Sequence, residues 1–174
     1  MIRFLLLQGP KYRMIDNVKD SGTNASMIAS ECIHTTTVNV SVACLRRLRE
    51  LTSEPSSGKW TPKAYIRDMK SAYRQIPVAE EHQCCSTAAV WSPLDSCWKL
   101  FALVSLAFGL SAAVIQFNRV PAFLVAFPRR MLFIPTINFY DDFKFFDISC
   151  SKGSAELFSN KAIDFFDPKF DPEK

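Results

Sequence analysis

Asn138-Phe139-Tyr140-Asp141-Asp142-Phe143 is the stretch of sequence that decides the fold of this chain. Two adjacent carboxylates lie between apolar flanks, residues 131–139 before them and residues 143–149 after them, which are rich in aromatic and β-branched side chains. An acidic pair between two such runs is typical of a tight turn that joins two strands. The sequence therefore predicts an antiparallel hairpin whose tip carries Asp141 and Asp142.

An acidic hairpin tip is in most proteins only a solvated turn, because aspartates satisfy turn backbones by local hydrogen bonding. Here Tyr140 and Phe143 flank the acids, and two like charges held between apolar groups are costly unless something compensates for them. A divalent cation compensates carboxylates best. Asp141 and Asp142 are therefore candidate metal ligands, and a third carboxylate is expected near them.

The third carboxylate is expected at Asp68. Ala64, Ile66 and Asp68 alternate along one face of a predicted strand, and this face is predicted to point toward the core. An acid at the inward end of a strand requires a partner. The acidic hairpin supplies that partner if the two elements pair antiparallel.

Composition places the chain among ordinary globular proteins. A length of 174 residues with 48% hydrophobic side chains is enough for about one domain with a real core. The net charge of +4 permits a polyanionic partner without requiring one. The six cysteines lack zinc-type spacing, so free thiols are expected. The opening run Ile2–Leu7 is predicted to be a strand and is too short to span a membrane, so no membrane partner is expected.

Further elements follow from local patterns. Thr37 is a candidate cap for a helix over residues 38–50 whose inward positions are Val38, Val42, Leu45 and Leu48. Strands are predicted over residues 86–91 and 97–104, loops over residues 21–30 and 52–61, and a helix over residues 153–166 followed by a fraying tail. Ser111 is a candidate cap for a helix that Pro121 should kink or end.

Four motifs together resemble the reverse transcriptase family. Asp-x-x-x-Ala-Tyr-x-Gln-Ile-Pro-Val at 68–78, Phe-Gly-Leu-Ser at 108–111 and Phe-Tyr-Asp-Asp at 139–142 resemble successive motifs of the polymerase palm. Lys11-x-Arg13-x-Ile15-Asp16 resembles the fingers motif that precedes them. The resemblance covers about residues 2–150. Within the family, the chain looks most like DIRS-type retroelements and next most like gypsy-type elements.

The resemblance implies an α+β fold: a polymerase palm with an antiparallel sheet, helices on one face and partial fingers. Residues 1–62 would form partial fingers, 63–150 the palm core and 151–174 a trailing palm helix and tail. No thumb motif follows, so we expect the chain to be a fragment of a retrotransposon protein. Asn17 and Val114 depart from the residues that relatives often carry at these positions.

The resemblance also implies RNA-directed DNA polymerase activity, a nucleotidyltransferase that adds dNTPs to a primer 3′-hydroxyl with two Mg²⁺ or Mn²⁺ ions. Asp68, Asp141 and Asp142 would be the catalytic metal ligands. Substrate contacts are implied for five residues: Lys11, Arg13, Tyr73, Phe108 and Gly109. Lys11 and Arg13 would hold the triphosphate, and Tyr73 would exclude a ribose 2′-hydroxyl.

The expected partners are an RNA or DNA template with its primer, dNTPs, and further retroelement domains such as a thumb, ribonuclease H, integrase or recombinase. The expected location is intracellular, cytoplasmic or nuclear. The alternative is a catalytically silent remnant, or a co-opted nucleic-acid-binding or interaction module with the same fold. A two-carboxylate hydrolase ranks last, because His34 and His82 lack metal-ligand spacing.

Overall fold

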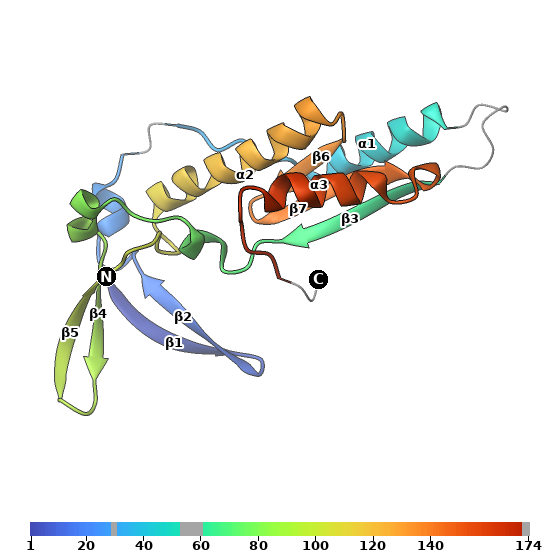
Figure 1. The fold of residues 1–174 in the computed structure, drawn as a ribbon. Coiled ribbons are helices and arrows are strands. Elements are labelled where there is room, and N and C mark those ends of the chain that lie inside the picture. Colours follow the sequence, from blue (N-terminus) through green and yellow to red (C-terminus); the bar gives the residue numbers. More distant parts are fainter. Residues whose placement is uncertain (29–30, 53–60, 172–174) are drawn as a thin grey trace. The chain divides into compact units, whose positions relative to one another are not determined.

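The computed structural model describes residues 1–28, 31–52 and 61–171 (Figure 1). The chain divides into two compact units, each made of two chain segments. Unit 1 contains residues 1–32 and 71–117, and unit 2 contains residues 33–70 and 118–174.

Unit 1 contains a four-stranded sheet in the order β2-β1-β4-β5. β1 (Ile2–Gln8) and β2 (Lys11–Asn17) form an antiparallel hairpin, and β4 (Thr87–Ser92) and β5 (Cys97–Ala102) form a second one. A single parallel bridge, Ile2 with Ala89, joins the two hairpins, and Figure 1 shows them diverging from this point. The strands predicted at the N-terminus and around residues 86–104 are confirmed.

Unit 1 has a small core. Val18, Ala107, Leu110 and Ala113 are buried together, and Tyr73 packs against them. In contrast, no residue of β1, β2 or β5 is buried as a whole. Short 3₁₀ turns at Thr23–Ser26, Ala72–Gln75 and Glu80–Cys85 connect the elements of this unit.

Unit 2 contains a three-stranded antiparallel sheet in the order β3-β7-β6. β6 (Thr136–Phe139) and β7 (Asp142–Ile148) form the acidic hairpin, and β3 (Pro62–Asp68) pairs with the full length of β7. Tyr140 and Asp141 make the turn, and Tyr140 has a φ of 52°. Both the predicted hairpin tip and the antiparallel pairing with the Asp68 strand are confirmed.

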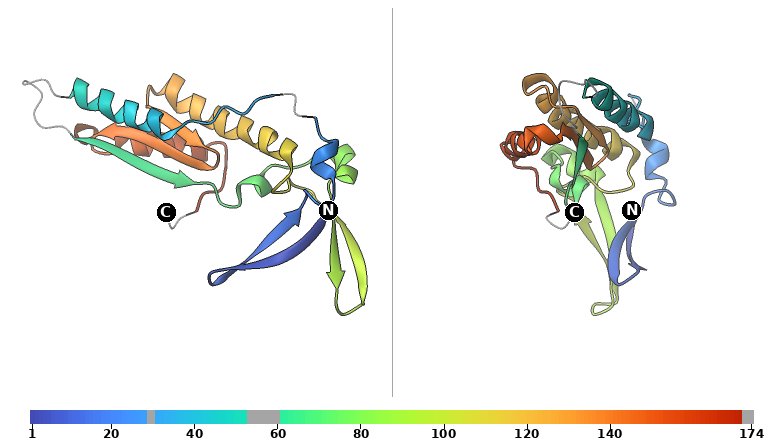
Figure 2. Two further views of the ribbon diagram at one scale, coloured as in Figure 1. Left: turned by 180° about the vertical axis from the view of Figure 1, so that it is seen from behind. Right: turned by 90° about the vertical axis from the view of Figure 1, so that its right-hand side faces the viewer.

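Helix α3 (Ser154–Asp164) packs on the sheet face that carries Arg67 and Phe143. Arg67 donates hydrogen bonds to Asn160 (3.1 Å) and Asp164 (3.2 Å) of this helix. Helix α1 (Val38–Leu51) also packs on β3 and β7, and Figure 2 shows it on the other side of the sheet from α3. The expectation that the helices lie on one face is therefore wrong for α1.

The core of unit 2 is largely aromatic. Phe143, Phe145 and Phe146 of β7 are buried on both faces of the sheet, together with Ile137 of β6. Residues of α2 and α3 complete this core: Leu124, Val125, Ala155 and Ile163. A central strand that is covered on both faces is expected to be continuously apolar, as β7 is around residue 145.

Two predicted inward faces are wrong. Ile66 is 53% exposed and Ala64 is exposed, whereas Tyr65 and Arg67 on the opposite face of β3 are half-buried. In α1, Val38 and Val42 are exposed, and only Leu45 and Leu48 of the predicted set are half-buried. Thr37 is at the N-cap position, although its side chain makes no capping hydrogen bond.

Helix α2 (Ser111–Met131) contributes residues 111–117 to unit 1 and residues 118–131 to unit 2. The helix continues through Pro121 and Pro128, so of the two predicted outcomes at Pro121, a kink or an end, the end is wrong. Both prolines are almost fully buried, and this apolar burial offsets the backbone hydrogen bonds that proline cannot make. Because α2 extends to Met131, β6 is shorter than the strand predicted over residues 131–139.

The segment after α3 is ordered against the sheet, at least to Asp171. Met69 and Phe170 form an antiparallel bridge, so the predicted fraying tail is wrong for residues 169–171. A local pattern could not reveal this contact, because its two partners are distant in sequence. Residues 53–60, most of the predicted loop over 52–61, lie outside the described residues.

The fold is α+β, as expected, with two antiparallel-rich sheets and three α-helices in the described residues. The units differ from the expected boundaries, since residues 33–62 belong with the Asp68 strand and residues 71–117 with the N-terminal hairpin. Within the described ranges, no helix is both long enough and apolar enough to cross a membrane.

Candidate functional site

The three candidate acidic residues lie at one end of the unit 2 sheet. Asp68 is the last residue of β3 and pairs directly with Asp142, the first residue of β7. Asp142 in turn pairs with Phe139 of β6. Directly opposed residues of antiparallel strands project their side chains to the same face, with Cβ atoms about 5 Å apart. Asp68 and Asp142 therefore share a face with Phe139.

Asp141 joins this group through the backbone. Its carbonyl oxygen accepts a hydrogen bond of 3.0 Å from the amide of Met69, the residue after Asp68. The two-residue turn, with Tyr140 in the left-handed region, brings the chain back immediately into β7. The sequence-predicted meeting of Asp68 with the acidic hairpin is thus present in the backbone pairing.

All three carboxylates are partly exposed. Carboxylate oxygens at the rim of a sheet are ligands that suit magnesium and manganese. Among the described residues, however, no three His, Cys, Asp or Glu side chains are arranged to hold a metal ion by themselves.

Two further candidates, Tyr73 and Phe108, lie in unit 1 and contact each other. Tyr73 stacks on Phe117, with ring centroids 4.5 Å apart, and meets Phe108 edge to face at 5.4 Å. Phe117 is fully buried, whereas Phe108 is 64% exposed. Tyr73 is half-buried against the core that contains Ala107 and Leu110. It therefore combines a core position with a partly accessible ring.

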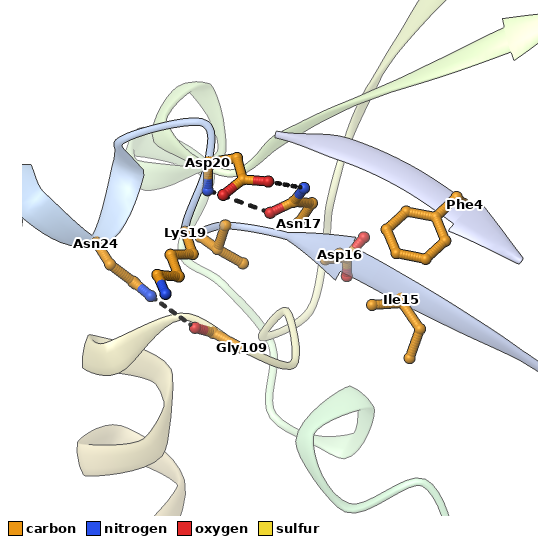
Figure 3. Close-up of a pocket in the computed structure, with 9 residues that line it drawn as sticks. Phe4, Ile15, Asp16, Asn17, Lys19, Asp20, Asn24 and Gly109 are labelled. Carbon is orange, nitrogen blue, oxygen red and sulfur yellow. Dashed lines mark hydrogen bonds between the residues drawn. The ribbon is translucent and has the colours of Figure 1, made fainter. Parts of the chain in front are cut away.

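Gly109 occupies a backbone position that suits glycine. Its φ is +100°, and a Cβ atom there would lie 3.1 Å from Cγ2 of Val18. Asn24 stabilises this turn from another part of the chain: it donates to the Gly109 carbonyl oxygen (3.0 Å) and accepts from the Ser111 amide (3.0 Å). Figure 3 shows Asn24 reaching the Gly109 turn.

Asn24, and not Ser111, therefore supplies the side-chain cap at the start of α2. Ser111 itself is the first residue of the helix. Asparagine is a common capping residue. Its partner lies 87 residues away in sequence, however, so no local pattern could identify it.

The Gly109 turn borders a pocket of about 400 Å³, drawn in Figure 3. Its lining is both polar and apolar: Phe4, Ile15, Asp16, Asn17, Val18, Lys19, Asp20, Asn24 and Gly109. Asp16 is held by Arg3 across the β1–β2 ladder, through contacts of 2.6 Å and 3.0 Å. The hydrogen bond to Asp16 raises the pKa of the Arg3 guanidinium, which therefore stays charged.

Lys11 and Arg13 are the remaining candidates. Both are exposed on β2, and the period of the strand places them on one face, as predicted. Their neighbours across the hairpin are Gln8 and Leu6. These residues belong to unit 1, whereas Asp68, Asp141 and Asp142 belong to unit 2.

The sequence matches no protein-family model, and no curated protein matches it.

Proposed function

We propose that this chain is the palm and fingers part of a retroelement reverse transcriptase, which adds dNTPs to a primer 3′-hydroxyl under the direction of an RNA or DNA template. The observation that carries the proposal is the pairing of Asp68 with Asp142 next to the Asp141 turn. This pairing joins two motifs that lie more than seventy residues apart, and the resemblance requires them to meet at one site.

In this proposal, Asp68 and Asp141 hold two magnesium or manganese ions, and Asp142 supports them from the adjacent position. Such ions stabilise the entering and leaving oxygens of the phosphoryl transfer. The chain itself contributes carboxylates fixed at the ends of paired strands, which limits their motion before the substrate arrives. Phosphate oxygens of the dNTP and water complete the coordination, because Mg²⁺ is usually held by one or two carboxylates together with substrate phosphates.

In this proposal, the candidate residues of unit 1 contact the nucleotide and the template. Lys11 and Arg13 attract the triphosphate charge from β2. Phe117 and Phe108 pack against the Tyr73 ring and hold it in place. A ribose 2′-hydroxyl placed beside this bulky ring would therefore clash with it. The Gly109 turn lies beside the base pair in this proposal, and its φ of +100° is a backbone conformation that glycine adopts without strain.

The test is the thermal stability of the full chain with Mn²⁺ and a dNTP. A ligand present at about 100 times its dissociation constant stabilises the folded state by about 2.7 kcal/mol. We expect a clear rise in Tm with both ligands together, a smaller rise with Mn²⁺ alone, and loss of both rises in Asp141→Asn. Asp95→Asn, which removes an exposed carboxylate from unit 1, should retain them.

A second experiment measures primer extension by a longer protein in which this chain is joined to a thumb domain. It distinguishes the polymerase from the catalytically silent module. Extension that Asp141→Asn abolishes supports the polymerase. A ligand-dependent shift without extension supports the alternative, a catalytically silent nucleic-acid-binding module. The absence of any shift in the folded wild-type chain would contradict a working metal site.

A further inference from the structure

The segment that follows α3 returns to the strand that carries Asp68. The Lys70 amide donates to the Lys169 carbonyl oxygen (2.9 Å), and the Asp171 amide donates to the Asp68 carbonyl oxygen (2.9 Å). Together with the Met69–Phe170 bridge, these bonds add residues 169–171 to the edge of β3 that β7 leaves open. We refer to residues 169–171 as the edge segment.

Phe170 anchors the edge segment. The guanidinium carbon of Arg67 lies 3.8 Å from the centroid of the Phe170 ring, and the ring of Phe143 meets it edge to face at 5.6 Å. Phe143 is fully buried, and Arg67 is held by Asn160 and Asp164 of α3. The anchoring ring therefore contacts groups that are themselves fixed by the fold.

The anchor and the candidate site occupy opposite faces of the same strand end. Arg67 and Phe143 are paired on the face that α3 covers, while Asp68 and Asp142 are paired on the other face. Asp68 is paired with Asp142 on one side, where the Met69 amide donates to the Asp141 carbonyl oxygen, and its own carbonyl oxygen accepts from the Asp171 amide of the edge segment on the other. Without the edge segment, this last residue of β3 would be at the end of an open edge strand.

We propose that Phe170 is a positioning residue for Asp68. The Phe170 ring packs against Arg67 and Phe143 and so fixes the edge segment on β3. The edge segment in turn keeps the Asp68 backbone in register with Asp142 before any ion is present. Neighbouring carboxylates repel one another, so a strand end that was free to move would separate them. A fixed strand end keeps their oxygens within reach of one cation. The inference rests on the proposed function, because it concerns the same metal site.

The experiment measures the Mn²⁺ dissociation constant of the full chain in the presence of a dNTP, by the electron paramagnetic resonance signal of free Mn²⁺. Solutions of Mn²⁺ and dNTP without protein provide the background. Phe170→Ala should weaken Mn²⁺ binding about tenfold, the lower end of the effect of losing a group that supports metal ligands. Phe170→Tyr keeps the ring between Arg67 and Phe143 and should restore wild-type affinity.

Phe166→Ala is the matched control. Phe166 is four positions earlier in the same tail, but its ring contacts Phe123, Phe127 and Phe165 and none of the residues around Asp68. This variant should lower the Tm while its Mn²⁺ dissociation constant stays at the wild-type value. An equal loss of affinity in both alanine variants would overturn the positioning role, because general destabilisation would then explain it.

Amide hydrogen exchange provides a readout that needs no metal. In the wild type, the Lys70 and Asp171 amides should be protected, and Phe170→Ala should expose both while the amides of β7 stay protected. If exchange changes in this way but the Mn²⁺ affinity does not, the edge segment is only structural and the inference is wrong. Equal Mn²⁺ binding by wild type and Asp68→Asn would overturn the proposed function, and this inference with it.

Discussion

The two sheets of this molecule bury their side chains very differently. In unit 2, β7 is covered on both faces and its three phenylalanines are inaccessible to solvent. In unit 1, β1, β2 and β5 contain no buried residue, although Leu5, Leu7 and Leu100 are large and apolar. Apolar composition alone therefore does not distinguish a core strand from an exposed one.

The difference bears on the candidate functions of the two units. The carboxylates Asp68, Asp141 and Asp142 are at the ends of strands in the better packed unit, where small shifts of ligand position are resisted. The candidate substrate contacts Lys11 and Arg13 are on a strand with little packing. Local stability generally follows the density of buried contacts, and binding elements are often drawn from the less stable parts of a protein.

The largest effect is expected from a core substitution in unit 2. Phe145→Ala removes a buried ring from β7 and should cost about 3–5 kcal/mol in the free energy of unfolding, measured by urea denaturation. The matched change in unit 1, Leu100→Ala, removes a side chain that is 74% exposed and should cost about 0.5 kcal/mol or less. Similar costs at both positions would show that the unit 1 sheet is covered in solution.

A smaller effect is expected at the Gly109 turn of unit 1. Gly109→Ala forces a side chain into a backbone region that alanine avoids and brings its Cβ close to Val18, at a cost of about 2 kcal/mol or more. Gly9→Ala is the control, because its φ is +60° and nothing lies within 4 Å of an added Cβ. That variant should lose only about 1 kcal/mol. Urea denaturation of both variants measures the two losses in the free energy of unfolding, and the loss should be larger for Gly109→Ala.

Sugar selection tests whether Tyr73 is more than a core residue of unit 1. Tyr73→Ala removes the ring supported by Phe108 and Phe117 and should reduce the preference for dNTPs over ribonucleotides by about tenfold or more. The measurement is the ratio of kcat/KM for the two substrates in the thumb-bearing protein. Tyr73→Phe keeps the ring and should leave the ratio unchanged. An unchanged ratio in Tyr73→Ala would return Tyr73 to a purely structural role.

The smallest effect is expected at the tip of the β4–β5 hairpin. Hydrogen bonds from Lys99 and Ser92 lower the pKa of the Asp95 carboxyl below its ordinary value of 3.8. A carboxyl whose pKa is lowered by folding contributes stability above its unfolded pKa, and this contribution is lost as the pH falls through the folded pKa. The NMR titration of Asp95 should therefore lie below 3.8, and Lys99→Met should move it upward.

Local patterns predicted much of the fold. The hairpin at Tyr140 and Asp141, the β4–β5 hairpin and the extents of α1 and α3 follow from turn residues, strand composition and helical spacing, which act over a few neighbouring residues. The pairing of Asp68 with the acidic hairpin was also predictable, because an acid at the end of a strand requires a partner. These features depend on interactions that short stretches of chain specify.

Other features were decided by contacts between distant parts of the chain. Which face of β3 is inward depends on what packs against the sheet, so Ile66 is exposed although its alternation with Asp68 was evident. The continuation of α2 through Pro121 depends on burial of that helix face.

By itself, the sequence determined the acidic turn, the strands beside it and the carboxylates that the turn could bring together, because these rest on local propensity and period. Tertiary structure alone decided the capping hydrogen bond between Asn24 and Ser111 and the packing of Phe170 against Arg67 and Phe143. Each of these contacts joins residues far apart in the chain, and its free energy appears only after the intervening elements have packed.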